Sequence, residues 1–428
     1  MYRKLSILRT TVVKEAFIYT VTDMISKGMS FILLLLISYY LPPAELGIAT
    51  NFIVLTQLII LLSGLAIVNS LPYFFYEQEQ EENTLLVSCI MVLCITLCIL
   101  IGGVILLFHK YIYDYLLLDC RIQYLSILYV FGSLVSQISL IIFRLENKPR
   151  QFAALQIIQI ILQVVTVALF VIILKGGGFG KIYAEVITFA IIGILHIYIL
   201  VRKGYLRFRI EFYYMKKLLR FGIPLFPHSV SFWLKNGIDK VFITTYCGLQ
   251  FNGIYSMAVN ICALYTMLTH SFFNAYTPYL QKKISTYSSQ EQLMIQKKQI
   301  VKHIYLLYLL FFVICIFAIG CAWLIITYVI DSKYISAFKY IPIMMLAHFI
   351  YTFYSFTIQF IYKAKKTLIM GCITFIGSLM QMLLSYWLIR SLGVIGSVYS
   401  LLIGNILITI GIFAYSNKVY KMPWFSFR

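Results

Sequence analysis

Charged residues are scarce in this chain of 428 residues, since Asp, Glu, Lys and Arg together make up only 12% of it. A soluble globular domain carries about twice that share. Hydrophobic residues make up 61%, so the chain has too few polar side chains to cover a water-facing surface of its own. This composition excludes an ordinary soluble protein and predicts an integral membrane protein.

Acidic residues are the scarcest of the charged groups, with 15 Asp and Glu against 35 Lys and Arg and a formal net charge of +20. In a soluble protein such an excess would suggest nucleic acid as the partner. The high hydrophobicity excludes that class, and we expect no nucleic-acid partner. The informative question is where along the chain the positive charge lies.

Catalytic and nucleotide-binding motifs are also missing from the sequence. It has no Ser/His/Asp or Cys/His constellation and no HExxH motif, and the run Gly176-Gly177-Gly178 lacks the Lys-Ser/Thr of a phosphate-binding loop. The nine cysteines show no metal-ligand spacing, and whether Cys120 and Cys247 pair stays open. We therefore expect a transporter and not an enzyme, without metal or cofactor, and with a proton or sodium gradient as a candidate energy source.

What the sequence does contain is a series of twelve mostly apolar stretches, each long enough to cross a bilayer as a helix. They lie at about residues 16–40, 46–70, 84–108, 122–143, 152–174, 182–201, 219–246, 253–281, 303–330, 339–363, 368–390 and 394–416. Because they are continuously apolar and do not alternate in ten-residue segments, they favour transmembrane helices over a β-barrel. The first stretch is too long for a cleavable signal peptide, so we expect it to remain in the protein.

The basic residues between these stretches predict the orientation in the membrane. With the N-terminus in the cytoplasm, 25 of the 35 Lys and Arg fall in cytoplasmic segments and 7 in outside segments. Cytoplasmic loops of membrane proteins carry such an excess, so we expect both termini in the cytoplasm. The longest polar connections, 202–218 and 282–302, are both basic and predicted to be cytoplasmic, which leaves no room for a folded domain outside the membrane.

The two halves of the chain resemble each other at a constant offset of 206 residues. Gly47-Ile48 falls on Gly253-Ile254, and Pro72-Tyr73 falls on Pro278-Tyr279. We therefore predict an N-terminal six-helix bundle (1–201), a basic linker (202–218) and a C-terminal six-helix bundle (219–428), related by a pseudo-two-fold axis along the membrane normal. The alternative is a chance resemblance between hydrophobic helices.

Ionisable residues inside the predicted spans are costly to insert, so they usually face a cavity or a partner. Asp23 and Lys27 lie four apart in the first span; Lys235 and Asp239 lie four apart in the seventh, with Lys240 beside them. This spacing places each carboxylate on one helix face with a lysine. Each carboxylate could simply neutralise its lysine, but the second cluster keeps one unmatched cation, as an anionic ligand would require.

Amide side chains mark one face of the fifth span, where Gln156, Gln159 and Gln163 follow each other at helical spacing. Such residues can line a polar path through the membrane. They can equally form hydrogen bonds to neighbouring helices. The sequence leaves both interpretations open.

Two segments resemble the polysaccharide-exporter family. LLRFGIPLFPHSVSFWLKNGIDKVFITTYCGLQFNGIYSMAVNI (218–261) has that family's Gly-x-Pro opening at Gly222–Pro224, its Asp at Asp239, and its Gly-Ile-Tyr at Gly253-Ile254-Tyr255. YYLPPAELGIATNF (39–52) is similar to the family's first helical hairpin. The resemblance is to the O-antigen flippase (Wzx-type) branch of the multidrug/oligosaccharidyl-lipid/polysaccharide exporter superfamily.

The resemblance implies an all-α integral membrane protein with twelve transmembrane helices in two six-helix bundles around a central cavity, a fold like that of the MATE exporters. It further implies a flippase in the bacterial cytoplasmic membrane that moves an oligosaccharide on undecaprenyl pyrophosphate by alternating access. Candidate partners are the lipid-linked oligosaccharide, the bilayer, and polysaccharide polymerase and chain-length proteins.

This resemblance implies roles in substrate binding for the polar and charged residues inside the predicted spans. The pyrophosphate would contact Lys27, Lys235 or Lys240, and Asp23 and Asp239 would tune these lysines or couple to an ion gradient. The residues expected to meet sugar hydroxyls are Gln156, Gln159, Gln163 and Asn236.

Two other functions stay open. A MATE-type exporter of cationic drugs would use Asp23 and Asp239 as ligands, although its cleft is typically acidic. A membrane glycan polymerase or ligase is disfavoured by the short outer loops. Lipid II flippases usually have fourteen spans, two more than the sequence predicts here.

Overall fold

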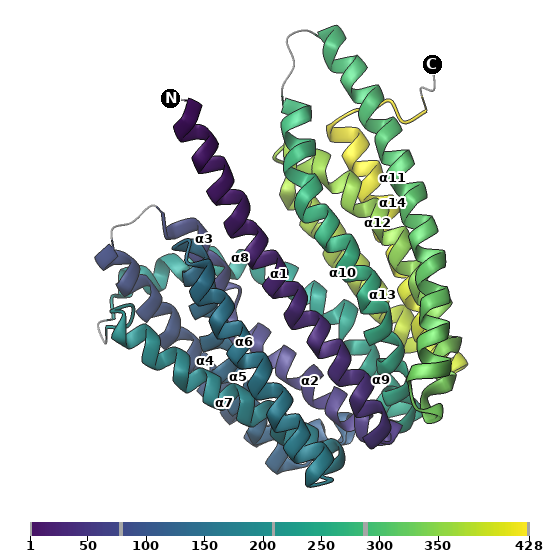
Figure 1. Cartoon of the computed structure of the whole chain (residues 1–428). Helices are drawn as coiled ribbons and strands as arrows, with labels where there is room; N and C mark the ends of the chain where they lie inside the picture. The colour runs from purple at the N-terminus through teal and green to yellow at the C-terminus, as the bar shows by residue number, and fades with distance from the viewer. Residues whose placement is uncertain (1, 77–79, 208–209, 286–289, 426–428) are drawn as a thin grey trace. The chain divides into compact units, whose positions relative to one another are not determined.

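The computed structural model describes residues 2–76, 80–207, 210–285 and 290–425, and all regular structure in these ranges is helical. The chain divides into two compact units, residues 1–229 and 230–428. Figure 1 draws the first unit in purple to teal and the second in teal to yellow.

Unit 1 consists of long helices connected by short turns. Its elements are α1 (Tyr2–Tyr40), α2 (Pro43–Gly64), η1 (Ile67–Ser70), α3 (Leu71–Phe74), α4 (Gln80–Leu116), α5 (Cys120–Leu145), α6 (Pro149–Val167), the π-helical η2 (Ala168–Ile173), α7 (Gly177–Arg202) and the first part of α8 (Phe212–Asn236). Pro43 and Pro149 stand in the first turns of α2 and α6, where the missing N–H of proline costs no hydrogen bond.

Helices α5 and α7 pack closely because glycines face each other where they cross. A Cβ atom added at Gly193 would lie 2.7 Å from the Cα atom of Gly132, and one added at Gly132 would collide with the carbonyl of Phe189. Small residues at such a crossing bring two membrane helices into backbone contact. At the start of α7, the backbone N–H of Gly178 donates to the Glu45 carboxylate at 2.9 Å, so the triple-glycine turn binds a side chain of α2.

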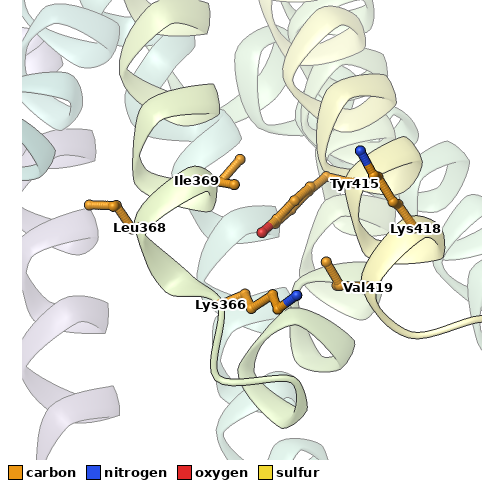
Figure 2. A pocket seen from close by; sticks show the side chains of 6 residues that line it. All are labelled: Lys366, Leu368, Ile369, Tyr415, Lys418 and Val419. Carbon is orange, nitrogen blue, oxygen red and sulfur yellow. The ribbon is translucent and has the colours of Figure 1, made fainter.

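Unit 2 contains the end of α8 and the remaining helices. They are α9 (Ile238–Cys247), α10 (Leu249–Ser285), α11 (Gln290–Leu324), the π-helical η3 (Ile325–Val329), η4 (Ser332–Lys339), α12 (Ile341–Lys363), α13 (Thr367–Leu392) and α14 (Val394–Val419). Gly248 and Gly393 connect successive helices with φ of 95° and 68°, a backbone conformation that glycine adopts without strain. A cavity lies between the start of α13 and the end of α14 (Figure 2).

The helix content agrees with the predicted all-α membrane class. Among the described residues, eleven helices are long and apolar enough to cross a membrane. The seventh predicted span, 219–246, is divided between α8 and α9 at Gly237, and α9 alone has only 10 residues. The exact number of twelve crossings and the arrangement as six plus six therefore stay predictions.

The predicted linker, 202–218, comprises the end of α7, a connection of which residues 208–209 lie outside the described ranges, and the start of α8. The division between the compact units falls later, between Ser229 and Val230 inside α8. The first half of α8 packs in unit 1, where Gly222 approaches the backbone of Leu65 and Phe221 contacts Tyr73.

The internal repeat matches the helix bounds at its first hairpin. With the offset of 206, the start of α2 at Pro43 falls on the start of α10 at Leu249. The two helices differ in length, because α2 ends at Gly64 whereas α10 continues to Ser285. All nine cysteines are free, including Cys120 and Cys247, and Cys372 on α13 is exposed.

Candidate functional site

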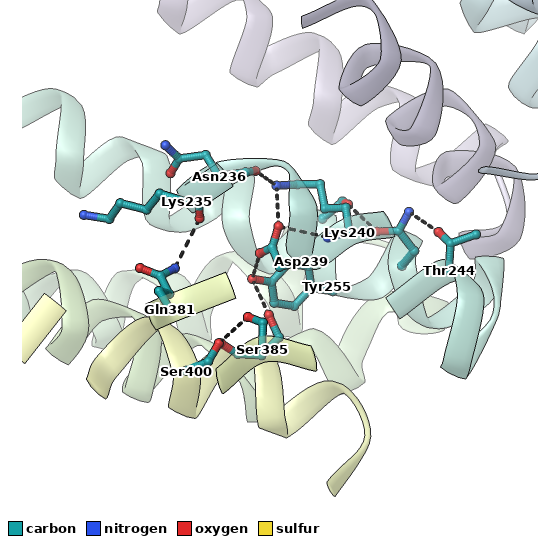
Figure 3. A network of polar contacts seen from close by, with 12 residues as sticks. Lys235, Asn236, Asp239, Lys240, Thr244, Tyr255, Gln381, Ser385 and Ser400 are labelled. Atoms are coloured by element: carbon teal, nitrogen blue, oxygen red, sulfur yellow. Dashed lines mark hydrogen bonds and ion pairs between the residues drawn. The ribbon is translucent and has the colours of Figure 1, made fainter. Parts of the chain in front are cut away.

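The mid-span charges of unit 2 lie on either side of the break between α8 and α9. Lys235 stands near the end of α8, Gly237 has φ −118° and ψ −42°, and Asp239 begins α9. Because the two residues belong to different helices, their spacing of four does not bring them together. In Figure 3 the side chain of Lys235 points away from Asp239 and Lys240.

Asp239 is buried in a network of polar contacts drawn from three helices (Figure 3). Its carboxylate accepts a hydrogen bond from the Tyr255 hydroxyl, which in turn accepts one from Ser397 at 3.0 Å. The Lys240 ammonium lies 3.6 Å from the other carboxylate oxygen and donates to the backbone carbonyl of Asn236. Lys240 therefore pairs with Asp239 and is not the unmatched cation of this cluster.

Lys235 is the cation that the cluster leaves without a carboxylate. Its ammonium nitrogen lies 3.4 Å from the centroid of the Tyr351 ring on α12, a cation–π contact. Its backbone carbonyl accepts a hydrogen bond from the Gln381 amide of α13 at 3.3 Å. Throughout the part of the chain that the structure describes, no Asp or Glu forms an ion pair with Lys235.

Asn236, expected to contact sugar, is exposed, and its side-chain amide donates to the carbonyl of Phe232 one turn earlier at 2.9 Å. This bond is local and leaves the amide oxygen of Asn236 available at the surface of unit 2.

In unit 1 the carboxylate of Asp23 does not pair with Lys27, the pairing that the sequence left open as an alternative. One oxygen of the Asp23 carboxylate lies 3.3 Å from the guanidinium of Arg144, at the end of α5, and the other accepts from the Gln156 amide at 3.3 Å. Arg144 is positioned by stacking over Phe152, with 4.9 Å from its guanidinium carbon to the ring centroid. Lys27 is exposed and has no ion-pair partner among the residues that the structure describes.

The three glutamines of the fifth predicted span all contact protein groups. Besides the bond from Gln156 to Asp23, the amide oxygen of Gln159 accepts from Ser136 at 3.4 Å. Gln163 donates to Glu185 at 3.2 Å. These are the cross-helix hydrogen bonds that the sequence left open as an alternative, and contact with sugar stays a prediction.

Several residues of these networks escape sequence reasoning. Arg144 counts there only as one of the basic residues that follow a span, and Tyr351 and Gln381 are ordinary residues of apolar helices. Tyr255 belongs to the Gly-Ile-Tyr motif, but the motif does not indicate its bond to Asp239. Glu185 is 8% exposed and forms an ion pair with Lys181 at 3.5 Å. An acidic residue inside a span was the available signal for it.

Metal binding finds no support in the described part of the chain, where no group of three or more His, Cys, Asp or Glu side chains comes together. The mid-span carboxylates of Asp23 and Asp239 instead pair with Arg144 and Lys240, whereas Lys27 and Lys235 have no ion-pair partner among the described residues. The arrangement is therefore suited to an anionic ligand more than to a metal ion or an organic cation.

Comparisons with known proteins show the same fold and a related sequence. The chain is 21% identical over 377 residues to protein 1 of the Lsg locus of Haemophilus influenzae, covering 84% of this chain and 87% of that protein. The lipid II flippase MurJ in an inward closed conformation matches with a TM-score of 0.70 and 15% identity, covering 93% of this chain and 87% of that one.

A MATE family multidrug resistance transporter of the MOP superfamily, in an inward-facing conformation, matches with a TM-score of 0.67 and 16% identity over 91% of this chain and 94% of that one. These structural matches show that the chain shares the fold of MATE and MurJ transporters. At sequence identities of 15% and 16% they do not establish a substrate. Residues 12–284 match the family model described as polysaccharide biosynthesis protein, which is most of the chain. The chain therefore belongs to the polysaccharide biosynthesis protein family, as its Gly-x-Pro and Gly-Ile-Tyr segments predict.

Proposed function

We propose that this protein is a flippase that moves an oligosaccharide linked to undecaprenyl pyrophosphate across the bacterial cytoplasmic membrane by alternating access. Membership of the polysaccharide biosynthesis protein family and the fold shared with a lipid II flippase both support a lipid-linked oligosaccharide as the substrate. The oligosaccharide would be the repeat unit of an O-antigen, a capsule or a similar surface polysaccharide. Polymerase and chain-length proteins are candidate partners of this step.

The observation that carries the proposal is the uncompensated ammonium of Lys235. A lysine in a membrane span costs about 2.5–3.5 kcal/mol to insert, so a lysine without a carboxylate needs another reason to be there. The Tyr351 ring stabilises the cation without cancelling its charge. A pyrophosphate group supplies the missing anion, and Lys27 offers a second uncompensated ammonium in unit 1.

The paired residues have a secondary part in the proposal. Asp239 holds Lys240, so Lys240 contacts pyrophosphate only if its bond to Asp239 is exchanged for one to the ligand. That exchange, or protonation of Asp23 or Asp239, is where a proton or sodium gradient would act. Gln156, Gln159 and Gln163 would contact sugar hydroxyls by a similar exchange of partners.

Replacing Lys235 tests the proposal. In proteoliposomes, a fluorescent undecaprenyl-pyrophosphate oligosaccharide becomes accessible to an impermeant quencher as it is flipped. Lys235→Gln should slow this step at least about 10-fold, because a hydrogen bond to a charged group contributes about 1.5–3 kcal/mol. Lys339→Gln, which removes an exposed lysine from η4 of the same unit, should leave the rate unchanged. Equal rates in the two variants would remove Lys235 from the site.

A MATE-type exporter of cationic drugs is the second candidate, favoured by the structural match to a multidrug resistance transporter. Against it, the carboxylates of Asp23 and Asp239 already pair with Arg144 and Lys240. Drug resistance conferred by expression, together with unchanged surface polysaccharide after deletion of the gene, would favour this function over the flippase.

A further inference from the structure

A cavity of about 500 Å³ lies in unit 2, far along the sequence from the site of Lys235. It is formed by the first turn of α13 and the last turns of α14 (Figure 2). Its lining combines two lysines and a tyrosine with three aliphatic side chains. The lining residues are Lys366, Leu368, Ile369, Tyr415, Lys418 and Val419.

The two lysines of this cavity carry uncompensated charge. Lys366 and Lys418 are exposed, and the ammonium group of neither has a hydrogen-bond or ion-pair partner among the residues that the structure describes. No Asp or Glu follows Asp331 in the sequence, so neither α13 nor α14 supplies a carboxylate. Two cations at one cavity, with no carboxylate on either of its helices, favour an anion from outside the protein.

Hydrogen-bond donors in the same cavity also lack acceptors. The hydroxyl oxygen of Tyr415 is buried and has no hydrogen-bond partner, and in Figure 2 it points into the cavity. Leaving a buried hydroxyl unpaired costs about 1–3 kcal/mol. The start of α13 at Thr367 has no side-chain cap, so the first backbone N–H groups of a 26-residue helix face the same region.

The aliphatic wall of the cavity indicates what kind of anion fits. Leu368 is 82% exposed and Ile369 is 49% exposed, and both lie on a helix that is long and apolar enough to span the membrane. The distribution of basic residues predicts this end of α13 to be cytoplasmic, next to the leaflet whose anionic lipids attract basic residues. A phosphate group with an attached hydrocarbon chain would pair with the two lysines and pack against the aliphatic side chains.

We propose that this cavity binds the phosphate of an anionic phospholipid headgroup, held by Lys366, Lys418 and the Tyr415 hydroxyl, with an acyl chain along Leu368 and Ile369. The lipid is a resident of the bilayer and is not the transported substrate. The site is independent of Lys235, so the two proposals fail or succeed separately.

Native mass spectrometry of the purified full-length protein with added phosphatidylglycerol tests the proposal. The double variant K366Q/K418Q should bind phosphatidylglycerol at least about 10-fold more weakly than the parent protein. The control K365Q/K421Q removes two exposed lysines next to the same helix ends, and it should bind like the parent. Tyr415→Phe, which deletes only the hydroxyl, should weaken binding by a few fold.

Equal binding of phosphatidylglycerol by K366Q/K418Q and K365Q/K421Q would overturn the proposal. A second experiment measures the binding of inorganic phosphate alone. If phosphate binds in the millimolar range and phosphatidylglycerol does not, with both lysines required, the site belongs to a free phosphate compound and the lipid proposal is wrong. The thermal unfolding midpoints of the two double variants are compared without lipid. Equal midpoints would show that weaker binding by K366Q/K418Q does not result from loss of folding.

Discussion

The carboxylate of Asp239 connects three helices of unit 2 through hydrogen bonds. It is 7% exposed, and it connects the start of α9 to Tyr255 of α10 and, through that hydroxyl, to Ser397 of α14. The ammonium of Lys240 compensates its charge from the neighbouring position. Because both charged groups are largely shielded from water, removing one leaves the other uncompensated.

Asp239→Asn should therefore destabilise the protein by about 3–5 kcal/mol, the range for removing one partner of a buried ion pair. Asp239→Asn combined with Lys240→Gln should recover part of that loss, since neither charge then remains alone. Thermal unfolding of the single and double variants in detergent measures the coupling. Strictly additive losses would show that Asp239 and Lys240 do not stabilise each other.

Asp331 gives a residue-scale prediction for pH. Its side chain accepts the backbone N–H of Lys333 at 3.0 Å at the start of η4, and this bond, aided by the Lys333 charge, holds the pKa of Asp331 below its ordinary value. A lowered pKa means that the carboxylate stabilises the folded state above about pH 4 and loses this effect as pH falls through the lower folded-state pKa. Asp331→Asn should thus lower the unfolding midpoint at pH 7, and the difference should shrink as the pH is lowered below about 4. A difference that persists at low pH would contradict this assignment.

The identity of the charge partners was the part of the site that sequence could not provide. A spacing of four correctly places Asp23 and Lys27 on one face of a helix, but Asp23 pairs with Arg144, which lies 121 residues away along the chain. Which side chain reaches a carboxylate depends on how a second helix packs. Lys235 shows the converse, because the Gly237 break removes it from the carboxylate that its spacing suggests.

At the scale of elements, the crossing of α5 and α7 depends on two glycines. The crossing brings Gly132 and Gly193 so close that a single methyl group at either position overlaps the other helix. Water-driven hydrophobic association is absent in a bilayer, so such close packing supplies much of the attraction between helices.

Gly193→Ala should destabilise the protein by about 1–3 kcal/mol, since the added methyl group has to separate the two helices. Gly103→Ala is the matched control, because a Cβ atom at Gly103 on α4 meets nothing within 4 Å. That substitution should be neutral or stabilise by up to about 1 kcal/mol, the helix preference of alanine over glycine. Unfolding midpoints in detergent measure both, and equal effects would show that the crossing tolerates a methyl group.

Hydrophobic runs located the helices well but not their ends. The first predicted span begins at about residue 16, whereas α1 begins at Tyr2, and α11 begins at Gln290 although its apolar run begins near 303. Hydropathy reports which residues fit a bilayer, and a helix continues beyond it wherever polar residues also favour helix. The division at Gly237 went unpredicted, although the Asn236-Gly237 pair at this point is a sequence typical of turns.

At the scale of the whole molecule, the number of membrane crossings depends on α8 and α9. Eleven described helices are long and apolar enough to span, which would place the termini on opposite sides. If α8 and α9 together form one interrupted crossing, the number becomes twelve and both termini lie on the same side. The excess of basic residues in the predicted cytoplasmic segments favours the second arrangement.

Reporter fusions test this. Green fluorescent protein fused after Arg202, after Ser285 and at the C-terminus should fluoresce in all three cases, because each position is cytoplasmic if α8 and α9 cross. Alkaline phosphatase at the same positions should be inactive. Fluorescence after residue 202 combined with active phosphatase after residue 285 would show that α8 and α9 do not cross together.

Class and family were within reach of the sequence, since composition requires a membrane protein and the segments at 39–52 and 218–261 carry the resemblance that the family match confirms. The cavity of Lys366 and Lys418 could not be predicted from the sequence, because the two lysines are separated by the 26 residues of α13 and nearly all of α14. Only the packing of these helices brings the end of one next to the start of the other.

The exposed thiol of Cys372 has a practical consequence for these experiments. It lies three and four positions after Ile369 and Leu368, on the same face of α13. The other eight cysteines are buried or half-buried, and burial slows the reaction of a thiol. A membrane-permeant nitroxide reagent should therefore label the natural sequence mainly at Cys372, where electron paramagnetic resonance would report a bound acyl chain as reduced mobility of the label.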